Sequence, residues 1–487
     1  MLNDMQLLAA ANEDHCVFIE AIPGSGKTVV AVERFGIARY VGEDERGVLA
    51  IAFNVAAVAL LKSRIRERWG SGCLSFPHNV CTFDQMYREL IHFLVESGHI
   101  HWSDYYVGLD VCEDYRGCLG YLDGVNGSFE LSLDDSRTLI VSPCVNAGAS
   151  CGFESRDAMW EIVRCGVISY NDMRSIIDCI RRDRYLTNIV IGWLKRCYRC
   201  IIVDEAYDMN DSNLWFVDLC FRAQLDITIV GDPWQALYGW RDAVPDLIKK
   251  YVEDPDRRFV KYVLKRSYRF ESPEQIERVT TLREGGLLAL EHGDSIDVDV
   301  VLGSQWSSLW YLGSNVIPLS FGKVAGFAAA ISCSLLHELL MRNFGFGSPH
   351  FDDAVRVLKL SPEQLERCNE IIVDPVLSHL EARGDVDEVF IRRIELECRG
   401  LGCLLEDEGE DSGNRLTKNL KLLSLRFQGG NLIPAMTVNQ AKGREWDRVG
   451  VWFSKLPEVL DIKKEHHRKI YVAVTRSRLS TCLLKKR

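Results

Sequence analysis

A phosphate-binding loop near the amino terminus constrains the fold of this 487-residue chain more than any other feature. The apolar residues 16–20 suit a buried strand, and they lead into Ala21-Ile22-Pro23-Gly24-Ser25-Gly26-Lys27-Thr28 and then into helix-compatible residues 29–40. Glycines let the backbone wrap closely around phosphate oxygens, while the loop amides and the helix dipole face the anion. A glycine-rich turn before an ordinary helix is the alternative, but it would not need both flanking elements. The pattern therefore predicts an α/β fold with a parallel sheet.

The residue types in this loop also predict a ligand. Lys27 would reach the β- and γ-phosphates of ATP, and Thr28 would bind Mg²⁺. The backbone of Gly24, Ser25 and Gly26 would surround the phosphates. We therefore expect ATP and Mg²⁺ as cofactors.

Two further strand ends carry polar groups that suit phosphate chemistry. The apolar residues 200–203 lead directly into Asp204 and Glu205. Asp204 would position Mg²⁺, and Glu205 would act as the general base on the attacking water. A third strand-like segment, residues 227–230, precedes Gln235, whose amide would sense the γ-phosphate or the water. Without the upstream loop, both carboxylates would merely cap a strand.

An aromatic segment follows this glutamine at once. Residues 236–241 read Ala-Leu-Tyr-Gly-Trp-Arg, so Tyr238 and Trp240 stand beside a cation. Bases of any identity stack on such rings, at about 1–3 kcal/mol per base. An aromatic pair this close is more often core by pattern alone, but its position after a phosphate sensor favours a stacking platform.

Charge and hydropathy narrow the class of protein. The net charge of −11 argues against a protein that simply coats DNA, but it allows a local basic groove. The acidic run at residues 406–411 is interpreted as a solvated loop. The longest nearly uncharged apolar stretch, residues 324–336, is shorter than the ~18 residues of a spanning helix, and no signal peptide is apparent. We expect a soluble intracellular protein, cytoplasmic or associated with the nucleoid.

The 17 cysteines are interpreted as free thiols in a chain without a secretory signal. An iron–sulfur or zinc site is the alternative for the five between two of the motifs, but their spacing fits no standard ligand pattern: Cys112, Cys118, Cys144, Cys151 and Cys165. We expect these to be small core residues rather than metal ligands.

The order of the motifs resembles the superfamily 1A helicases UvrD, PcrA and Rep, over most of residues 1–90, 198–272 and 430–484. In the first part, the resemblance covers the adenine-reading Q-motif, the DNA-contacting motif Ia and the next DNA-contacting motif, and then motifs II and III, at residues 2–6, 50–65, 82–84, 204–208 and 231–241. It implies that Gln6 reads adenine and that DNA is contacted by Phe53, Thr82, Phe83, Tyr238 and Trp240.

The second part is similar to motifs IV, V and VI of the same family, at residues 267–269, 437–446 and 471–476. The resemblance implies that Tyr268 stacks on adenine and that Glu445 binds the ribose. Arg269 and the arginine finger Arg476 would both contact the γ-phosphate across a cleft between two cores. Thr437 would contact DNA.

Four positions depart from the family pattern. Asn439 stands where the family usually has His, and Val29 stands where UvrD and PcrA carry an Arg against adenine. Val55 and Ala56 replace the usual polar and basic pair of motif Ia. These changes bear on base selectivity and on DNA grip, since none removes a group of the phosphate chemistry.

The resemblance implies two RecA-like cores. The first would comprise residues 1–90 and 196–265, interrupted by a mainly helical subdomain at 91–195. The second would comprise residues 266–323 and 430–487. Its insertion, residues 324–429, would be a reduced helical one, because large UvrD-type helicases carry a much longer segment there.

The activity implied is that of an ATP-dependent DNA helicase or translocase, moving 3′ to 5′ along single-stranded DNA and acting at single-strand/double-strand junctions. The compact layout also resembles GajB, the helicase-like subunit of the Gabija anti-phage system. The alternative function is therefore a DNA-sensing ATPase subunit that works with a nuclease in antiviral defence. A small-molecule kinase with a phosphate loop is a third class, but it would need neither the aromatic segment nor a second core.

Overall fold

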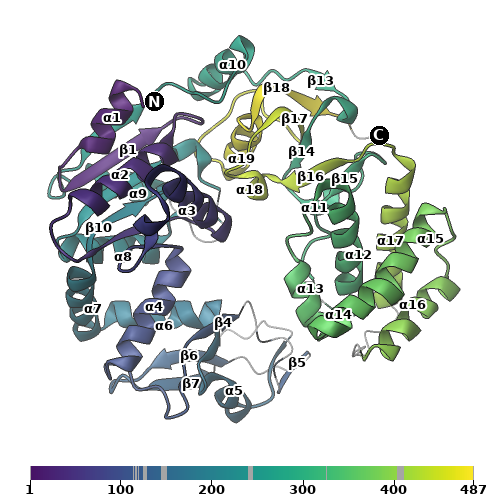
Figure 1. The fold of residues 1–487 in the computed structure, drawn as a ribbon, viewed down its shortest axis with the longest axis horizontal. Helices are drawn as coiled ribbons and strands as arrows, with labels where there is room; N and C mark the ends of the chain where they lie inside the picture. Colours follow the sequence, from purple (N-terminus) through teal and green to yellow (C-terminus); the bar gives the residue numbers. More distant parts are fainter. Residues whose placement is uncertain are drawn as a thin grey trace. The chain divides into compact units, whose positions relative to one another are not determined.

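The computed structural model describes residues 2–112, 115, 118, 120–123, 129–143, 151–237, 239, 245–324, 326–402 and 411–485. The chain forms two compact units, Met1–Tyr268 and Arg269–Arg487. Each unit contains its own sheet of parallel strands (Figure 1). A mixed α/β fold with two parallel sheets is the one predicted from the sequence.

The sheet of the first unit has the strand order β12-β1-β11-β10-β2-β3, and all of its neighbours pair in parallel. Its strands are short apolar runs with both faces covered, as a parallel sheet requires. Val17 and Ile19 pack in one cluster, whereas Cys16 and Phe18 pack in another. The strands are β1 (Cys16–Ala21), β2 (Gly47–Ile51), β3 (Asn79–Cys81), β10 (Tyr198–Val203), β11 (Asp226–Gly231) and β12 (Val260–Leu264).

Helices connect these strands, and several begin with a side-chain cap. Asn3 and Gln6 form a capping box at the first helix, and Thr82 and Gln85 form another at the helix after β3. The helices are α1 (Asp4–Ala11), α2 (Lys27–Val41), α3 (Val55–Trp69), α4 (Phe83–Glu96), α8 (Asp211–Arg222) and α9 (Pro245–Glu253), with short 3₁₀ turns η1 (Ser71–Leu74), η2 (Ala206–Asp208) and η3 (Pro233–Gln235).

Residues 91–195 contain short strands as well as helices. The strands pair as β4 with β9, β5 with β8 and β6 with β7. The buried carboxylate of Asp172 accepts hydrogen bonds from the Tyr115 hydroxyl at 2.6 Å, the Ser169 hydroxyl at 2.5 Å and the Leu131 amide at 3.3 Å. This network ties a helix to the strand pairs. The elements are β4 (Asp110–Cys112), β5 (Tyr121–Asp123), β6 (Phe129–Leu133), β7 (Leu139–Pro143), β8 (Cys151–Phe153), β9 (Val167–Ser169), α5 (Arg156–Val163), α6 (Tyr170–Arg182) and α7 (Arg184–Cys197).

Among the cysteines of this segment, Cys165 is exposed and Cys112 and Cys118 are half-buried, so these three are not the buried core residues that the sequence predicted. Cys144 and the side chain of Cys151 lie outside the described residues. Over the described part of the chain, no group of three or more His, Cys, Asp or Glu side chains is arranged to hold a metal ion.

The sheet of the second unit has the order β13-β18-β17-β14-β16-β15, again with parallel neighbours. Its strands are β13 (His292–Gly293), β14 (Val300–Gly303), β15 (Val316–Pro318), β16 (Ile433–Thr437), β17 (Trp446–Trp452) and β18 (Ser477–Leu484). The helices packed with it are α10 (Pro273–Arg283), the 3₁₀ turn η5 (Ser295–Asp297), α11 (Trp306–Leu309), α18 (Val438–Ala441) and α19 (Glu465–Val474).

A block of helices is inserted between β15 and β16. Arg426 anchors its end, since the buried guanidinium donates to the carbonyls of Trp310 at 2.7 Å and Val316 at 2.9 Å. Burial lowers the pKa of Arg426 to about 10. The elements are α12 (Phe327–Phe344), α13 (Phe351–Leu358), α14 (Pro362–Cys368), the π-turn η6 (Asn369–Val373), α15 (Asp374–Glu381), α16 (Glu388–Gly400), α17 (Asp411–Ser424) and η7 (Leu425–Gln428).

The apolar stretch 324–336 and the acidic run 406–411, both noted in the sequence, fall in or beside this block. Its longest helix, α12, is apolar and largely buried. None of the helices in the described ranges is long and apolar enough to span a membrane. Nearly all of the acidic run at 406–411 lies outside the described residues.

Candidate nucleotide and nucleic-acid site

The predicted site residues of the first unit follow the carboxyl ends of its parallel strands. Lys27 follows β1, Asp204 follows β10 and Gln235 follows β11, and these three strands are neighbours in the sheet. Phe53 follows β2 and Thr82 follows β3 on one side of them. Ligands of open α/β sheets bind at this edge. The strand order therefore gathers motifs that lie far apart in the sequence.

The loop before α2 is shaped for phosphate. Gly24 and Gly26 have φ values of 73° and 83°, a left-handed conformation that favours glycine. A Cβ atom on Gly26 would also overlap Nε2 of Gln6. That amide donates to the Ser25 carbonyl at 2.9 Å. The amino-terminal helix thus holds the loop in place, and only glycine fits at position 26.

Four polar side chains of the two motifs meet beside this loop. Lys27 is only 8% exposed, and its Nζ forms an ion pair with Oε1 of Glu205 at 3.5 Å. Within the described residues, this ammonium has no hydrogen-bond acceptor. Thr28 donates its hydroxyl to Oδ2 of Asp204 at 3.1 Å. A buried ammonium without acceptors is unfavourable, so Lys27 suits an anionic oxygen, while the hydroxyl and carboxylate oxygens suit Mg²⁺.

The carboxylate pair is held under electrostatic strain. Burial and the neighbouring Glu205 raise the pKa of Asp204 to about 6, although Lys27 opposes them. Glu205 has a φ of 56°, which is unusual for a residue with a side chain. A cation bound at Asp204 would relieve this repulsion. The arrangement is therefore suited to a divalent metal.

The predicted phosphate sensor is positioned by an aspartate that the motif analysis did not single out. Gln235 is buried, and its Nε2 donates to Oδ2 of Asp232 at 2.9 Å. Asp232 also caps the short turn η3. The residues just after Gln235 are tied to the carboxylate motif: the Leu237 amide donates to Oδ1 of Asp208 at 2.9 Å. Tyr238 and Trp240 lie outside the described residues.

The predicted adenine-contacting residues lie beside the same loop. Tyr268 is 49% exposed, and its backbone amide donates to the Gly24 carbonyl at 2.8 Å. Its hydroxyl accepts a hydrogen bond from Nδ2 of Asn3 at 2.5 Å, and the Arg266 guanidinium lies 5.1 Å from the ring centroid. Sequence reasoning missed Asn3 as a site residue. The capping-box spacing of Asn3 and Gln6 was the signal that could have identified it.

The predicted residues of the second unit form a cluster of charges within that unit. Arg269 donates to the Thr475 carbonyl at 2.8 Å and pairs with Oε1 of Glu445 at 3.2 Å. Burial raises the pKa of Glu445, but Arg269, Arg476 and Arg478 outweigh it and hold the pKa below its usual value. Arg476 is 1% exposed and donates to the Val472 carbonyl at 3.2 Å. Glu445 is therefore the anion of an arginine cluster.

The fourth predicted residue of this unit is expected to contact DNA rather than nucleotide. Thr437 ends β16 and stands before α18, where its side chain makes no capping hydrogen bond. Its predicted DNA contact stays a prediction.

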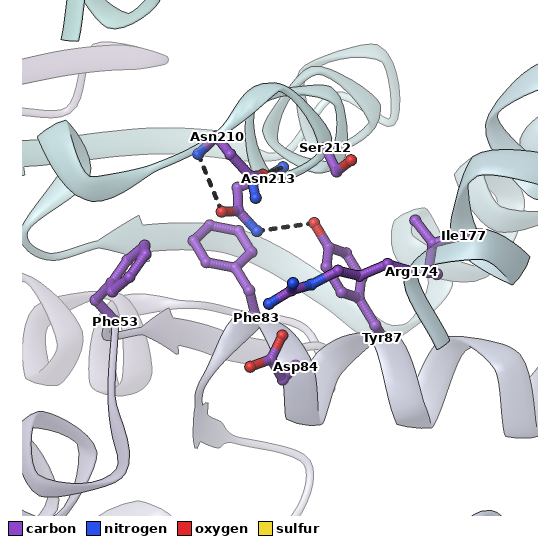
Figure 2. Close-up of a pocket in the computed structure, with 9 residues that line it drawn as sticks. All are labelled: Phe53, Phe83, Asp84, Tyr87, Arg174, Ile177, Asn210, Ser212 and Asn213. Atoms are coloured by element: carbon purple, nitrogen blue, oxygen red, sulfur yellow. Dashed lines mark hydrogen bonds between the residues drawn. The ribbon is translucent and has the colours of Figure 1, made fainter. Parts of the chain in front are cut away.

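The first unit has a pocket of about 470 Å³, a volume that includes the solvent at its opening (Figure 2). It lies where β2 ends and α4 begins. The predicted DNA-contacting residues Phe53 and Phe83 both line it. Thr82 does not line it; this residue is buried, and its hydroxyl accepts the Gln85 amide at 3.1 Å at the start of α4. The lining residues are Phe53, Phe83, Asp84, Tyr87, Arg174, Ile177, Asn210, Ser212 and Asn213.

Comparisons with known proteins agree with this arrangement. Residues 2–106 and 164–256 match the UvrD/REP helicase N-terminal domain, and residues 432–484 match the UvrD-like helicase C-terminal domain. Together the two matches cover just over half of the chain.

Individual relatives are distant. A protein of Mycoplasma capricolum described as "Probable DNA helicase II homolog" is 24% identical over 291 residues, which are 55% of this chain and 39% of that protein. A "Probable DNA helicase" of Mycoplasma pneumoniae is 22% identical over 267 residues, 52% of this chain and 50% of the relative. The ATP-dependent DNA helicase Rep of Buchnera aphidicola is 26% identical over 101 residues, 20% of this chain and 15% of that protein. The matches thus span half or less of these relatives.

Proposed function

Because this chain belongs to the UvrD-like family of superfamily 1 helicases, we propose that it hydrolyses ATP to move along single-stranded DNA. The observation that carries the proposal is the buried Lys27 ammonium, which lacks an acceptor within the described residues and stands in a glycine loop opposite Asp204 and Glu205. A triphosphate with its Mg²⁺ supplies the anionic oxygens and the cation that these groups need.

Each predicted site residue of the first unit has one role in the proposed chemistry. Bound Mg·ATP would supply the phosphoanhydride bond and a cation that offsets the phosphate charge. Lys27 donates to the β- and γ-phosphate oxygens, and Thr28 and Asp204 hold the cation. Glu205 accepts the proton of the attacking water, which Gln235 orients. Gln6 and Tyr268 bind the adenine ring.

The second unit contributes the remaining charges in this proposal. Arg269 and Arg476 stabilise the charge on the γ-phosphate in the transition state, and Glu445 binds the ribose. Neither arginine belongs to the unit that contains the phosphate loop. Turnover therefore depends on both units, which gives hydrolysis a means to drive movement.

Single-stranded DNA is the proposed track. Phe53 supplies an aromatic face for bases, with Tyr238 and Trp240 of the aromatic segment. Phe83 is buried and backs the pocket. Thr82 and Thr437 are the proposed polar contacts. Travel from 3′ to 5′, and action at single-strand/double-strand junctions, are the expectations that the family resemblance gives.

The test is ATP turnover with and without single-stranded DNA. We expect DNA to stimulate turnover, and we expect Lys27→Ala and Glu205→Gln to lower it by about 10²–10⁴-fold, the usual contribution of a positioned acid or base. Glu205→Gln should still bind nucleotide, because it removes only the base. The exposed Glu13 provides the matched control Glu13→Gln, which should behave as the parent. Turnover at the parental rate in Glu205→Gln would refute the assignment.

A further inference from the structure

The pocket in Figure 2 contains a cation that no motif predicts. Arg174 belongs to α6, in the segment 91–195 that separates the two parts of the first core. Its side chain extends past Tyr87 toward Phe83 and Asp84 (Figure 2). Phe53 reaches the pocket from the loop after β2. Three parts of the chain thus place aromatic rings and a guanidinium around one space.

Within the described residues, the guanidinium of Arg174 forms no ion pair and no side-chain hydrogen bond, although the carboxylates of Asp84 and Asp178 act on the same Tyr87 hydroxyl as this guanidinium does. Other arginines nearby are paired, as Arg181 of the same helix is with Asp211 at 2.5 Å. Arg174 is half-buried, so part of its hydration is lost without compensation. Such a group is poised for an anionic ligand.

The wall beside Arg174 is rigid. Nδ2 of Asn213 donates to the Tyr87 hydroxyl at 2.9 Å, and its Oδ1 accepts the Asn210 amide at 3.2 Å (Figure 2). Burial raises the pKa of the Tyr87 hydroxyl far above its usual value, so it stays neutral. Neither Tyr87 nor Asn213 supplies a charge. Arg174 is therefore the group in this pocket that recognises an anion.

We propose that the pocket binds one nucleotide unit of single-stranded DNA, with its base against Phe53 and a flanking phosphate on Arg174, while the buried Phe83 packs on Phe216 and backs the pocket. The proposal rests on the proposed function and adds to it a phosphate contact outside the helicase motifs. A planar guanidinium suits a phosphate, and phenyl rings accept any base. Because Arg174 extends toward the Asp84 carboxylate, this carboxylate lies near the proposed phosphate and weakens its binding.

The test compares the full-length parent with Arg174→Gln, Arg174→Lys and the control Arg182→Gln. Arg182 is an exposed arginine at the end of the same helix and does not line the pocket. Affinity for a labelled oligodeoxythymidylate is measured over a range of salt concentrations. We expect Arg174→Gln to lose about tenfold in affinity, as for one charge-assisted hydrogen bond. Its log–log salt slope should fall by about 0.7, the value for one phosphate contact on a single strand.

Arg174→Lys should keep the salt slope because it keeps the charge, and Arg182→Gln should match the parent. Titrations of Arg174→Gln and Arg182→Gln that coincide, in a parent that binds DNA, would overturn the inference alone. A parent that binds no single-stranded DNA would instead overturn the proposed function.

Two measurements distinguish a phosphate contact from a packing role and from a site for free nucleotide. Weaker binding with an unchanged salt slope, or with a lowered melting temperature, would show that Arg174 acts through packing and would overturn the phosphate contact. DNA-free ATPase should keep its KM for ATP in Arg174→Gln. A raised KM would assign the pocket to free nucleotide, against the proposal.

Discussion

The hydrogen bonds of Gln6 hold the phosphate loop and are compatible with its proposed role in adenine recognition. Its Nε2 donates to the Ser25 carbonyl, and its Oε1 accepts the Asn3 amide at 2.9 Å. A primary amide has two N–H donors and two acceptor lone pairs, so one of each remains after these bonds. Gln6 can therefore hold the phosphate loop and still present a donor and an acceptor to the edge of adenine. A substitution at Gln6 would change both, which makes it a poor probe of base recognition alone.

Tyr268 is the cleaner probe of adenine binding, because its ring is half-exposed and its hydroxyl bonds only at the edge of the site. We expect Tyr268→Ala to raise KM for ATP by about tenfold, the loss of one stacking contact, with kcat nearly unchanged. Tyr268→Phe keeps the ring and removes only the hydrogen bond from Asn3, so its KM should stay within about threefold of the parental value. Steady-state ATPase assays measure both. An unchanged KM in Tyr268→Ala would contradict the stacking role.

The residues proposed to carry the chemistry were easier to single out from the sequence than the residues that hold them. Lys27, Asp204 and Glu205 were predictable because their motifs are local and each follows an apolar strand. Asp232 and Arg174 were not, because their importance depends on partners brought near by the fold. Such contacts depend on the strand order, which local patterns do not contain.

At the scale of elements, the apolar runs that lead directly into a motif were the most predictable. The expected strands at residues 16–20, 200–203 and 227–230 lie within β1, β10 and β11. The strands between residues 91 and 195 were not foreseen, because they are three to five residues long and too short for a clear alternation of apolar and polar side chains. Their pairing depends on buried contacts such as those of Asp172 with Tyr115 and Leu131.

His78, which precedes β3 and hydrogen-bonds to β2, should make the free energy of unfolding depend on pH. His78 accepts the Val48 amide on its Nδ1 at 3.0 Å, and burial, aided by Arg39 and Arg199, lowers its pKa to about 4. An unfolded histidine titrates near 6.5, so between pH 6.5 and 4 the unfolded chain binds more protons than the folded one. The contribution of neutral His78 is thus complete above pH 6.5 and is lost progressively as the pH falls toward 4.

Denaturant unfolding of the parent and His78→Gln at several pH values between 7.5 and 4.5 measures this effect. The glutamine can still accept the Val48 amide, but it does not titrate. We expect the parent to lose stability on acidification faster than the variant, so the gap between them narrows. Other histidines titrate equally in both proteins and cancel. If the unfolding midpoints of the two proteins fall in parallel, the pKa of His78 is not lowered in the folded state.

At the scale of the whole molecule, the family matches leave out two stretches, residues 107–163 and 257–431. The first stretch includes the strand pairs beside α5, and the second includes the helical block from α12 to α17. Most of the motifs fall inside the matched residues, whereas the motif at residues 267–269 lies in the second stretch. We expect the size of these two stretches to bear on duplex unwinding, because the family resemblance implies that larger UvrD-type helicases contact the duplex through a longer insertion.

Duplex unwinding is where the short insertion should matter. Separating one base-pair step costs about 1.4 kcal/mol of stacking free energy on average. A motor must therefore either destabilise the junction or wait for it to fray. Residues 324–429 are too few for the full junction-contacting insertion of the larger relatives. We expect strong ATPase stimulation by single-stranded DNA but weak, short-range unwinding by the protein alone. A protein partner, such as the nuclease of a defence complex, should extend it.

The measurement is strand displacement on duplexes of increasing length, each with a 3′ single-stranded tail, at fixed ATP. Glu205→Gln provides the control without turnover. Displacement should fall steeply with duplex length, because each added step raises the barrier that fraying must overcome. A duplex with a 5′ tail in place of the 3′ tail tests the direction of travel in the same assay. Efficient displacement of long duplexes without a partner would show that the short insertion is no handicap, and it would favour an autonomous helicase over a DNA-sensing subunit.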